Sequence, residues 1–127
     1  MLTSYFDTIR QALILYELID SFRIIRELSG NNDGFIRIKC SLADGSTLEF
    51  AEYVQLKAGS IYLQTYSYHW QSCKGTLLKR WDNAPHHPEI ATFPDHLHKG
   101  DVIADSKPMT LALVLIAIGN TLSGETE

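Results

Sequence analysis

Alternating hydrophobic and polar residues on either side of an Asp-Gly turn constrain the fold most strongly. The stretch FIRIKCSL (35–42) is followed by the turn ADGS and by TLEFAEYV (47–54). The core-facing positions in this pattern are Ile36, Ile38, Cys40, Leu42, Leu48 and Phe50. Side chains alternate across a strand, and an Asp-Gly pair suits a tight turn, so the pattern predicts a β-hairpin with one buried face.

Other segments also carry strand signals: FRIIREL from residue 22, IYLQTYSYHWQ from residue 61 and TLLKRWD from residue 76. The last two are joined by the turn SCKG, and their predicted pairing places His69 opposite Leu78. In that register, His69, Arg80 and Asp82 lie on the same face of the sheet. A slip of one residue would turn a strand over, so this shared face depends on the register.

Helical periodicity appears at both ends of the chain. Apolar residues recur at spacings of three and four between residues 3 and 19, with Thr3 or Ser4 as the cap. Near the C-terminus, DSKP supplies a cap with Pro108 near the first helical position, and MTLALVLIAIGNTL follows as a helix.

The order of these elements predicts an α+β fold in a single domain, residues 1–127: an N-terminal helix, an antiparallel sheet of about five strands, a His- and Pro-rich loop and a C-terminal helix. A helix packed on the sheet also explains an aromatic stripe on the strand from residue 61 as a half-buried core face. We favour this over a surface that stacks bases for Tyr62, Tyr66, Tyr68 and Trp70.

The segment DNAPHHPEIATFPDHLHKGD (82–101) is unusual in composition. It contains four of the five histidines, three of the four prolines and three aspartates. Because Pro85, Pro88 and Pro94 lack backbone donors, we expect an ordered loop or a set of turns that crosses one face of the sheet. In extended backbone, His96 and His98 would point the same way.

Composition narrows the class of protein. The formal net charge of −4 argues against tight, nonspecific binding to nucleic acid, although residues 69–98 are formally neutral and leave room for a nucleic-acid substrate. The apolar run at 111–118 is too short to cross a membrane, and the N-terminus does not resemble a signal peptide. We therefore expect a cytoplasmic protein with no membrane partner. Cys40 and Cys73 do not form a metal or redox motif.

The histidine segment allows three kinds of chemistry. Paired histidines suit general acid and base catalysis on an RNA backbone, with Arg80 or Lys99 stabilising the phosphate charge. Histidines and aspartates are also ligands for a divalent metal ion that activates water, although their spacing matches no zinc signature. A structural role is the third: imidazoles capping loop carbonyls, with Asp82 and Asn83 in side-chain turns.

The run from Tyr66 to His98, and above all RWDNAPHH…TFPDHLH, resembles the TumE family of bacterial and archaeal toxin–antitoxin proteins. DGSTLEFAEYV at 44–54 fits the same family. The matching positions are Arg80, Asp82, Asn83, His86, His87, His96 and His98. At position 95, an aspartate stands where many relatives have a histidine. The resemblance implies a toxin with nuclease activity on RNA and a helix-turn-helix antitoxin as its partner.

Together, the residues and the resemblance predict the toxin of a type II toxin–antitoxin system that cleaves RNA without a cofactor. A divalent metal is the alternative to cofactor-free cleavage. The predicted catalytic residues are His69, Arg80, Asp82, His86, His87, His96 and His98. The alternative functions are a noncatalytic protein-binding module and a metal-dependent hydrolase of nucleotides or DNA. An antitoxin would bind the apolar C-terminal helix or an edge of the sheet.

Overall fold

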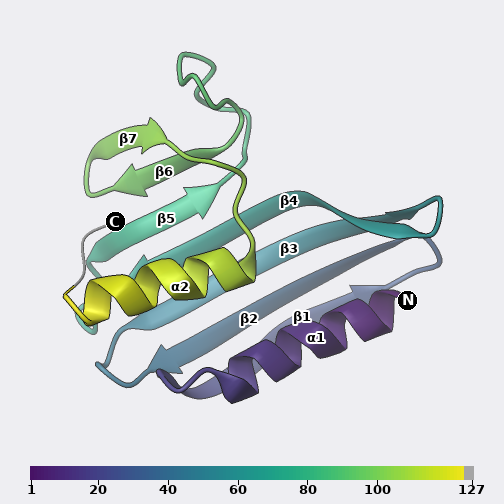
Figure 1. Ribbon diagram of the computed structural model, residues 1–127, viewed down its shortest axis with the longest axis horizontal. Helices are drawn as coiled ribbons and strands as arrows, with labels where there is room; N and C mark the ends of the chain where they lie inside the picture. Colours follow the sequence, from purple (N-terminus) through teal and green to yellow (C-terminus); the bar gives the residue numbers. More distant parts are fainter. Residues whose placement is uncertain (125–127) are drawn as a thin grey trace.

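A computed structural model describes residues 1–124 of the chain. Its helices are α1 (Leu2–Leu15) and α2 (Leu111–Leu122). Its strands are β1 (Ile19–Ser29), β2 (Asp33–Leu42), β3 (Thr47–Lys57), β4 (Ser60–Gln71), β5 (Leu77–Asp82), β6 (His96–Lys99) and β7 (Val102–Asp105). Short turns join most neighbouring elements, as expected for strands that pair with the next strand in sequence (Figure 1).

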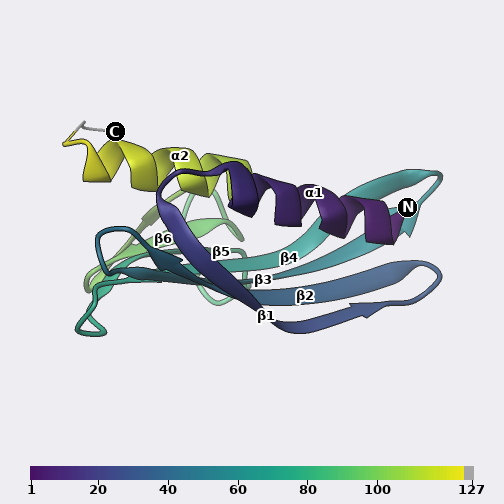
Figure 2. The ribbon, with the colours of Figure 1, turned by 90° about the horizontal axis from the view of Figure 1, so that it is seen from below.

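The described strands form one antiparallel sheet in the order β1-β2-β3-β4-β5-β6-β7. Both helices cover the same face of this sheet, and its other face is left open (Figure 2). The predicted α+β class is confirmed. The predicted strand number was too low, because β6 and β7 lie at or just beyond the end of the segment expected to be loop. The prolines of that segment end at Pro94, so the backbone from His96 onward is free to pair.

The core fills the space between the helices and the sheet. Its fully buried members include Phe6 and Leu13 from α1, Phe50 from β3 and Ile118 from α2. The hairpin prediction is confirmed by β2 and β3, since every predicted core-facing residue of that pair is buried. Burial of this apolar surface is the main stabilising contribution to the fold.

Both helices differ from their predictions at the ends. Helix α1 ends at Leu15, and Ile19 belongs to β1, where it pairs with Leu42 and packs against the core. Neither predicted N-terminal cap is used, since the cap position is Met1 and has no side-chain bond. In α2 the cap is Thr110, whose side chain accepts from the Leu113 amide at 3.3 Å, so the predicted DSKP cap was wrong.

The aromatic stripe on β4 is largely core. Tyr66, Tyr68 and Trp70 are buried, as predicted, but Tyr62 is 49% exposed. A bulge in the β3–β4 pairing shifts the register next to Tyr53, so the residues before and after it face opposite ways. The prediction for Tyr62 failed because a bulge inserts one residue and reverses the alternation.

A buried carboxylate joins α1 to the sheet. Glu52 is 1% exposed and accepts from the Tyr5 hydroxyl at 2.5 Å and the Tyr68 hydroxyl at 2.8 Å. Burial raises the pKa of Glu52, and these two hydrogen bonds oppose that rise. Glu52 lies on the helix side of the sheet, away from the open face.

The β4–β5 register differs from the prediction, but the predicted residues still share one face of the sheet. His69 pairs with Arg80 rather than Leu78, because Gln71 pairs with Leu77 instead of Thr76 and a bulge at Leu78 in β5 adds a second residue of offset. The offset is two residues, and an even shift preserves the face on which each side chain lies. His69, Arg80 and Asp82 therefore share the open face, as predicted.

Candidate active site

The histidine segment folds back onto the open face at the β5–β6 end of the sheet. Its first part, residues 83–95, forms turns, and its second part enters the sheet as β6. Because β5 and β6 are antiparallel, Asp82 lies opposite His96, and Arg80 lies opposite His98. All four side chains therefore share one face, and the prediction that His96 and His98 point the same way is confirmed.

Asp82 is the centre of the arrangement. Its side chain is 6% exposed, and its Oδ2 accepts from Arg80 Nε at 3.0 Å. Its Oδ1 lies 3.0 Å from His96 Nε2 and also accepts from the Ala84 amide at 3.0 Å. His98 Nε2 is 3.6 Å from Oδ2. A buried carboxylate is costly unless it is paired, and Asp82 is paired on both oxygens.

The hydrogen bonds of His96 fix how its ring is used. His96 is 2% exposed, and its Nδ1 lies 2.9 Å from the carbonyl oxygen of Pro94. A carbonyl only accepts, so Nδ1 carries a hydrogen. The other nitrogen, Nε2, then faces Asp82 and lies 3.1 Å from His98 Nε2. His96 Nε2, Asp82 Oδ1 and His98 Nε2 each have a lone pair directed at the others. A hydrogen on one of the nitrogens, or a cation between the three atoms, would satisfy these lone pairs.

His98 is more accessible than His96. Its side chain is 26% exposed, and its ring centroid lies 4.8 Å from that of His96. Burial lowers the pKa of His98, the Asp82 charge opposes this, and the cationic forms of its neighbours add to the lowering. The neutral ring is thus favoured, which suits a group that accepts a proton.

The loop supplies a third ring. The ring centroid of His87 lies 4.9 Å from that of His96 and 5.7 Å from that of His98. Its Nδ1 is 3.5 Å from an oxygen of Glu89. His87, His96 and His98 each place one ring nitrogen within 4.8 Å of the others.

The predicted site residues line one pocket. It has a volume of about 400 Å³, and the residues around it include His69, Arg80, Asp82, His86, His87, His96 and His98. His86 is exposed at its rim, and His69 approaches from β4 with Nε2 3.0 Å from Gln71 Oε1. The structure thus brings together residues separated by up to 29 positions in the sequence. Their catalytic roles stay predictions.

Asn83 and Asp95, which flank the loop, have structural contacts. The Asn83 side chain accepts from the Tyr66 amide and donates to the Gln64 carbonyl, each at 2.9 Å, so it extends the β4 pairing instead of forming the predicted side-chain turn. Asp95 accepts from the Tyr66 hydroxyl at 2.5 Å. Both side chains anchor the ends of the loop to β4.

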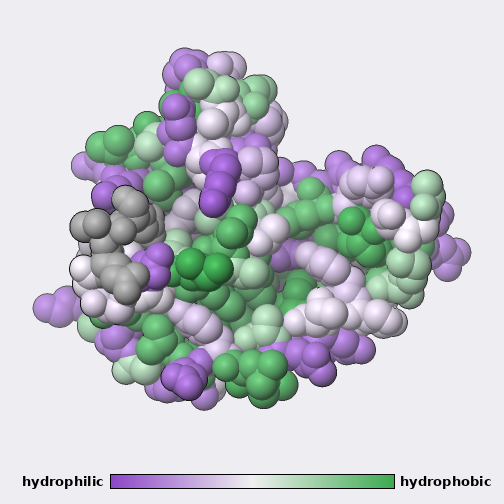
Figure 3. All heavy atoms as spheres, viewed as in Figure 1, coloured by the Kyte–Doolittle hydropathy of each residue, from purple (hydrophilic) through white to green (hydrophobic). Residues whose placement is uncertain are grey.

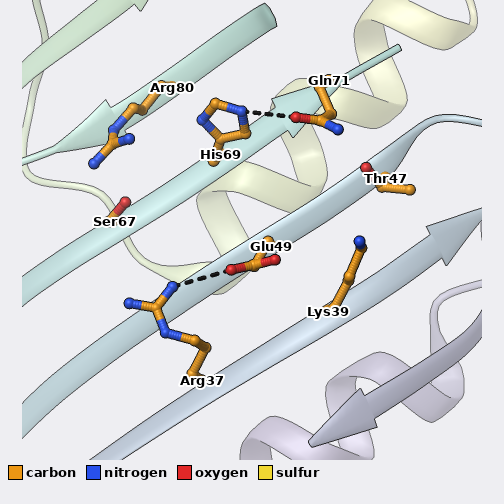
Figure 4. A pocket seen from close by; sticks show the side chains of 8 residues that line it. All are labelled: Arg37, Lys39, Thr47, Glu49, Ser67, His69, Gln71 and Arg80. Atoms are coloured by element: carbon orange, nitrogen blue, oxygen red, sulfur yellow. Dashed lines mark hydrogen bonds and ion pairs between the residues drawn. The ribbon is translucent and has the colours of Figure 1, made fainter. Parts of the chain in front are cut away.

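A second hollow, of about 500 Å³, adjoins the histidine pocket and shares His69 and Arg80 with it. Figure 4 shows Arg37 and Lys39 projecting into this hollow from β2, with Glu49 between them and the histidine side. Arg37 and Lys39 were not among the predicted site residues. The signal was present, since the alternation of β2 places both on the face opposite the core.

The fold and the pocket define a small α+β protein with a buried aspartate, a histidine cluster and an arginine on the open face of its sheet. The family model described as Toxin TumE matches residues 8–121. The chain therefore belongs to the TumE toxin family, as the sequence resemblance predicted. No curated protein and no solved structure matches it. Among the described helices, none has the length and apolar character needed to cross a membrane.

Proposed function

We propose that this TumE-family toxin cleaves RNA in the histidine pocket by general acid and base catalysis. The observation that carries the proposal is the convergence of His87, His98 and Arg80 around the buried pair Asp82 and His96. Clusters of ionisable groups with desolvated members are typical of active sites. A noncatalytic binding module would not need these groups to face one another in a pocket.

The roles follow from exposure and hydrogen bonding. His98, whose pKa is lowered, takes the proton from a ribose 2′-hydroxyl, and the 2′-oxygen attacks the adjacent phosphorus. His87, also partly exposed, donates a proton to the departing 5′-oxygen. The products are a 2′,3′-cyclic phosphate and a 5′-hydroxyl end.

Arg80 and the buried pair support this chemistry. The Nε of Arg80 is held by Asp82, while its side chain is 42% exposed, so the rest of the guanidinium can bind the phosphate oxygens. His96 is too buried to reach substrate, so we assign it and Asp82 to positioning His98 and Arg80.

A metal-dependent hydrolase is the second candidate, and one observation favours it. His96 Nε2 lies 3.0 Å from Asp82 Oδ1 and 3.1 Å from His98 Nε2. Ligands around a tetrahedral zinc ion, with bonds of about 2.1 Å, lie roughly 3.4 Å apart. His87, His96 and His98 form the group that would hold such an ion, with Asp82 beside His96 as a further ligand, and the ion would supply an activated water.

We also propose that an antitoxin covers an apolar hollow beside α2. This hollow, about 320 Å³ in volume, is lined by Trp81, Leu97, Leu113 and Ile116, among others. Ile116 is 58% exposed, and hydrophobic residues gather over α2 on this side of the molecule (Figure 3). An exposed apolar patch of this kind is typical of a protein interface. Covering it would leave the open face of the sheet, and the histidine pocket, on the other side.

The test of RNA cleavage is His98→Ala, with Lys107→Ala as a control at an exposed position away from the pocket. Loss of one general acid or base should lower the cleavage rate by roughly 10²–10⁴-fold, and growth arrest should fall with it. The control should cleave RNA and arrest growth like the parent. A folded His98→Ala protein, verified by circular dichroism, that cleaves at the parent rate would refute the proposal.

A further inference from the structure

Cationic side chains form a row across the open face of the sheet and lead to the histidine pocket. The pairing register places Arg23 opposite Lys39, Lys39 opposite Glu49 and Glu49 opposite His69. The same row continues from His69 to Arg80 and from Arg80 to His98. Residues directly opposite in an antiparallel sheet lie on the same face, so these side chains line one path from β1 to β6.

The neighbouring row strengthens the positive charge. Arg26 pairs with Arg37, and this row runs on through Ala51 and Ser67 to Asp82. The cations of the two rows are Arg23, Arg26, Arg37, Lys39 and Arg80. Arg23, Arg26 and Lys39 are exposed.

The carboxylates of these rows offset only part of that charge. Glu49 accepts from Arg37 at 3.1 Å, and Asp82 is buried against Arg80 and His96. Asp105, at the end of the second row, lies on the edge strand β7 beyond the histidines. The chain has a net charge of −4, yet the open face between β1 and β5 is predominantly cationic. Positive charge is therefore concentrated on the open face, although the whole chain is negative.

An apolar hollow lies beside this path. It has a volume of about 260 Å³, and its walls include Phe35, Tyr53 and Arg80. Phe35 and Tyr53 are opposite one another on β2 and β3, and the Tyr53 hydroxyl is held by Asp33 at 2.8 Å. Arg80 lines this hollow, the cationic hollow and the histidine pocket. A chain whose backbone follows the cations could therefore place a flat, apolar group against Phe35 and Tyr53.

We propose that the open face of the sheet is the binding path for a single-stranded nucleic acid, with its phosphates on the Arg23–Lys39–Arg80 row and an unstacked base in the Phe35–Tyr53 hollow. This inference rests on the proposed function, because it delivers the strand to the histidine pocket. From β1 to β6 the row spans about 24 Å, at about 4.8 Å per strand, which is long enough for several nucleotides. A duplex keeps its bases stacked and offers no free base to the hollow.

The test is the salt dependence of binding, measured by fluorescence anisotropy with a labelled 2′-O-methyl RNA 12-mer in EDTA. This probe lacks the hydroxyl that the proposed cleavage requires, so binding is measured without reaction. The double variant Arg23→Ser/Lys39→Ser removes two exposed cations from the row. The control Lys57→Ser/Lys107→Ser removes two exposed lysines that lie at the end of β3 and before α2.

Each phosphate contact contributes about 0.7 to the slope of log K against log salt for a single strand, so losing two should reduce the slope by about 1.4. Extrapolated from about 1 M to 0.1 M salt, the same loss weakens binding by roughly 25-fold. The control should match the parent. A double variant with the parent's affinity and slope, or a parent that binds no oligonucleotide, would overturn the proposal. A matched duplex that binds as tightly as the single strand would overturn its single-strand part.

These results separate this proposal from the proposed function. If the parent cleaves RNA while the double variant binds normally, the binding path is refuted and the proposed RNA cleavage still stands. If the parent binds through the row but cleaves no RNA, the proposed RNA cleavage is refuted and the binding path still stands.

Discussion

Replacing Asp82 with asparagine tests whether the buried carboxylate organises the pocket. The substitution preserves shape but removes the charge that holds Arg80 Nε and His96 Nε2, each at 3.0 Å. A hydrogen bond to a charged group contributes about 1.5–3 kcal/mol when it is buried. The His96 contact is buried and should account for about 2 kcal/mol. The Arg80 side chain is 42% exposed, so solvent screening reduces its share to about 1 kcal/mol or less.

We therefore expect Asp82→Asn to lower the free energy of unfolding by about 3 kcal/mol, measured by urea denaturation at neutral pH. The variant should also cleave RNA about 10²–10⁴-fold more slowly, because His98 and Arg80 lose their positioning partner. A folded variant that is destabilised by less than about 0.5 kcal/mol would contradict this prediction, because hydrogen bonds to a buried carboxylate contribute more than that to stability.

The pH profile separates positioning from simple loss of structure. The Asp82 charge opposes the lowering of the His98 pKa, so Asp82→Asn should lower that pKa further. The neutral, proton-accepting form of His98 then persists to lower pH. The acid limb of the residual cleavage profile should shift toward lower pH in the variant. An unchanged limb, or a shift toward higher pH, contradicts the assigned role of His98.

Further predictions concern the core and the partner surface. Burial raises the pKa of Glu52, so the folded state retains a proton that the unfolded chain has released, and stability falls as the pH rises from the ordinary glutamate range through the raised value. The parent should therefore lose stability relative to Glu52→Gln as the pH rises across that window, as measured by urea denaturation. Parallel plots of unfolding free energy against pH for the two proteins would count against this. Gly34→Ala should lower the free energy of unfolding by about 1–3 kcal/mol in the same assay, because the new methyl group would lie 2.9 Å from the fully buried Phe6 ring. A loss below about 0.3 kcal/mol would show that the core rearranges to accept the methyl group. Ile116→Asp should lower the affinity for the antitoxin at least tenfold, or about 1.4 kcal/mol, measured by copurification. Ile14→Asp, at a similarly exposed position on α1, should leave the affinity unchanged. Equal effects of the two substitutions would exclude α2 from the interface.

The fold was predictable where residue patterns repeat regularly. The β2–β3 hairpin followed from strict alternation around Asp44-Gly45, and the α+β class followed from the order of periodic segments. The bulges, at Gln64 in β4 and at Leu78 in β5, were not predictable in this way, because a bulge leaves composition unchanged and only displaces the pairing. This is why Tyr62 was placed on the wrong face, whereas the total offset of two residues between β4 and β5 preserved the predicted face of His69.

The candidate site was predictable as a set of residues but not as a geometry. The clustering of histidines between prolines marked the segment, and the alternation of β5 placed Arg80 and Asp82 on one face. The contact between Asp82 and His96 depends on β6 joining the sheet edge, a long-range pairing that no local pattern near Pro94 signals. The cationic row required the register of every strand from β1 to β6, since Arg23 and His98 are 75 residues apart in the sequence.

RNA cleavage by paired histidines can be measured by incubating purified protein with mixed RNA, with and without EDTA, and determining the chemistry of the new ends. We expect cleavage that survives EDTA and leaves 2′,3′-cyclic phosphate and 5′-hydroxyl ends, because His98 activates the 2′-hydroxyl and His87 protonates the departing 5′-oxygen without a metal ion. Loss of cleavage in EDTA would contradict this expectation and make the same histidines metal ligands.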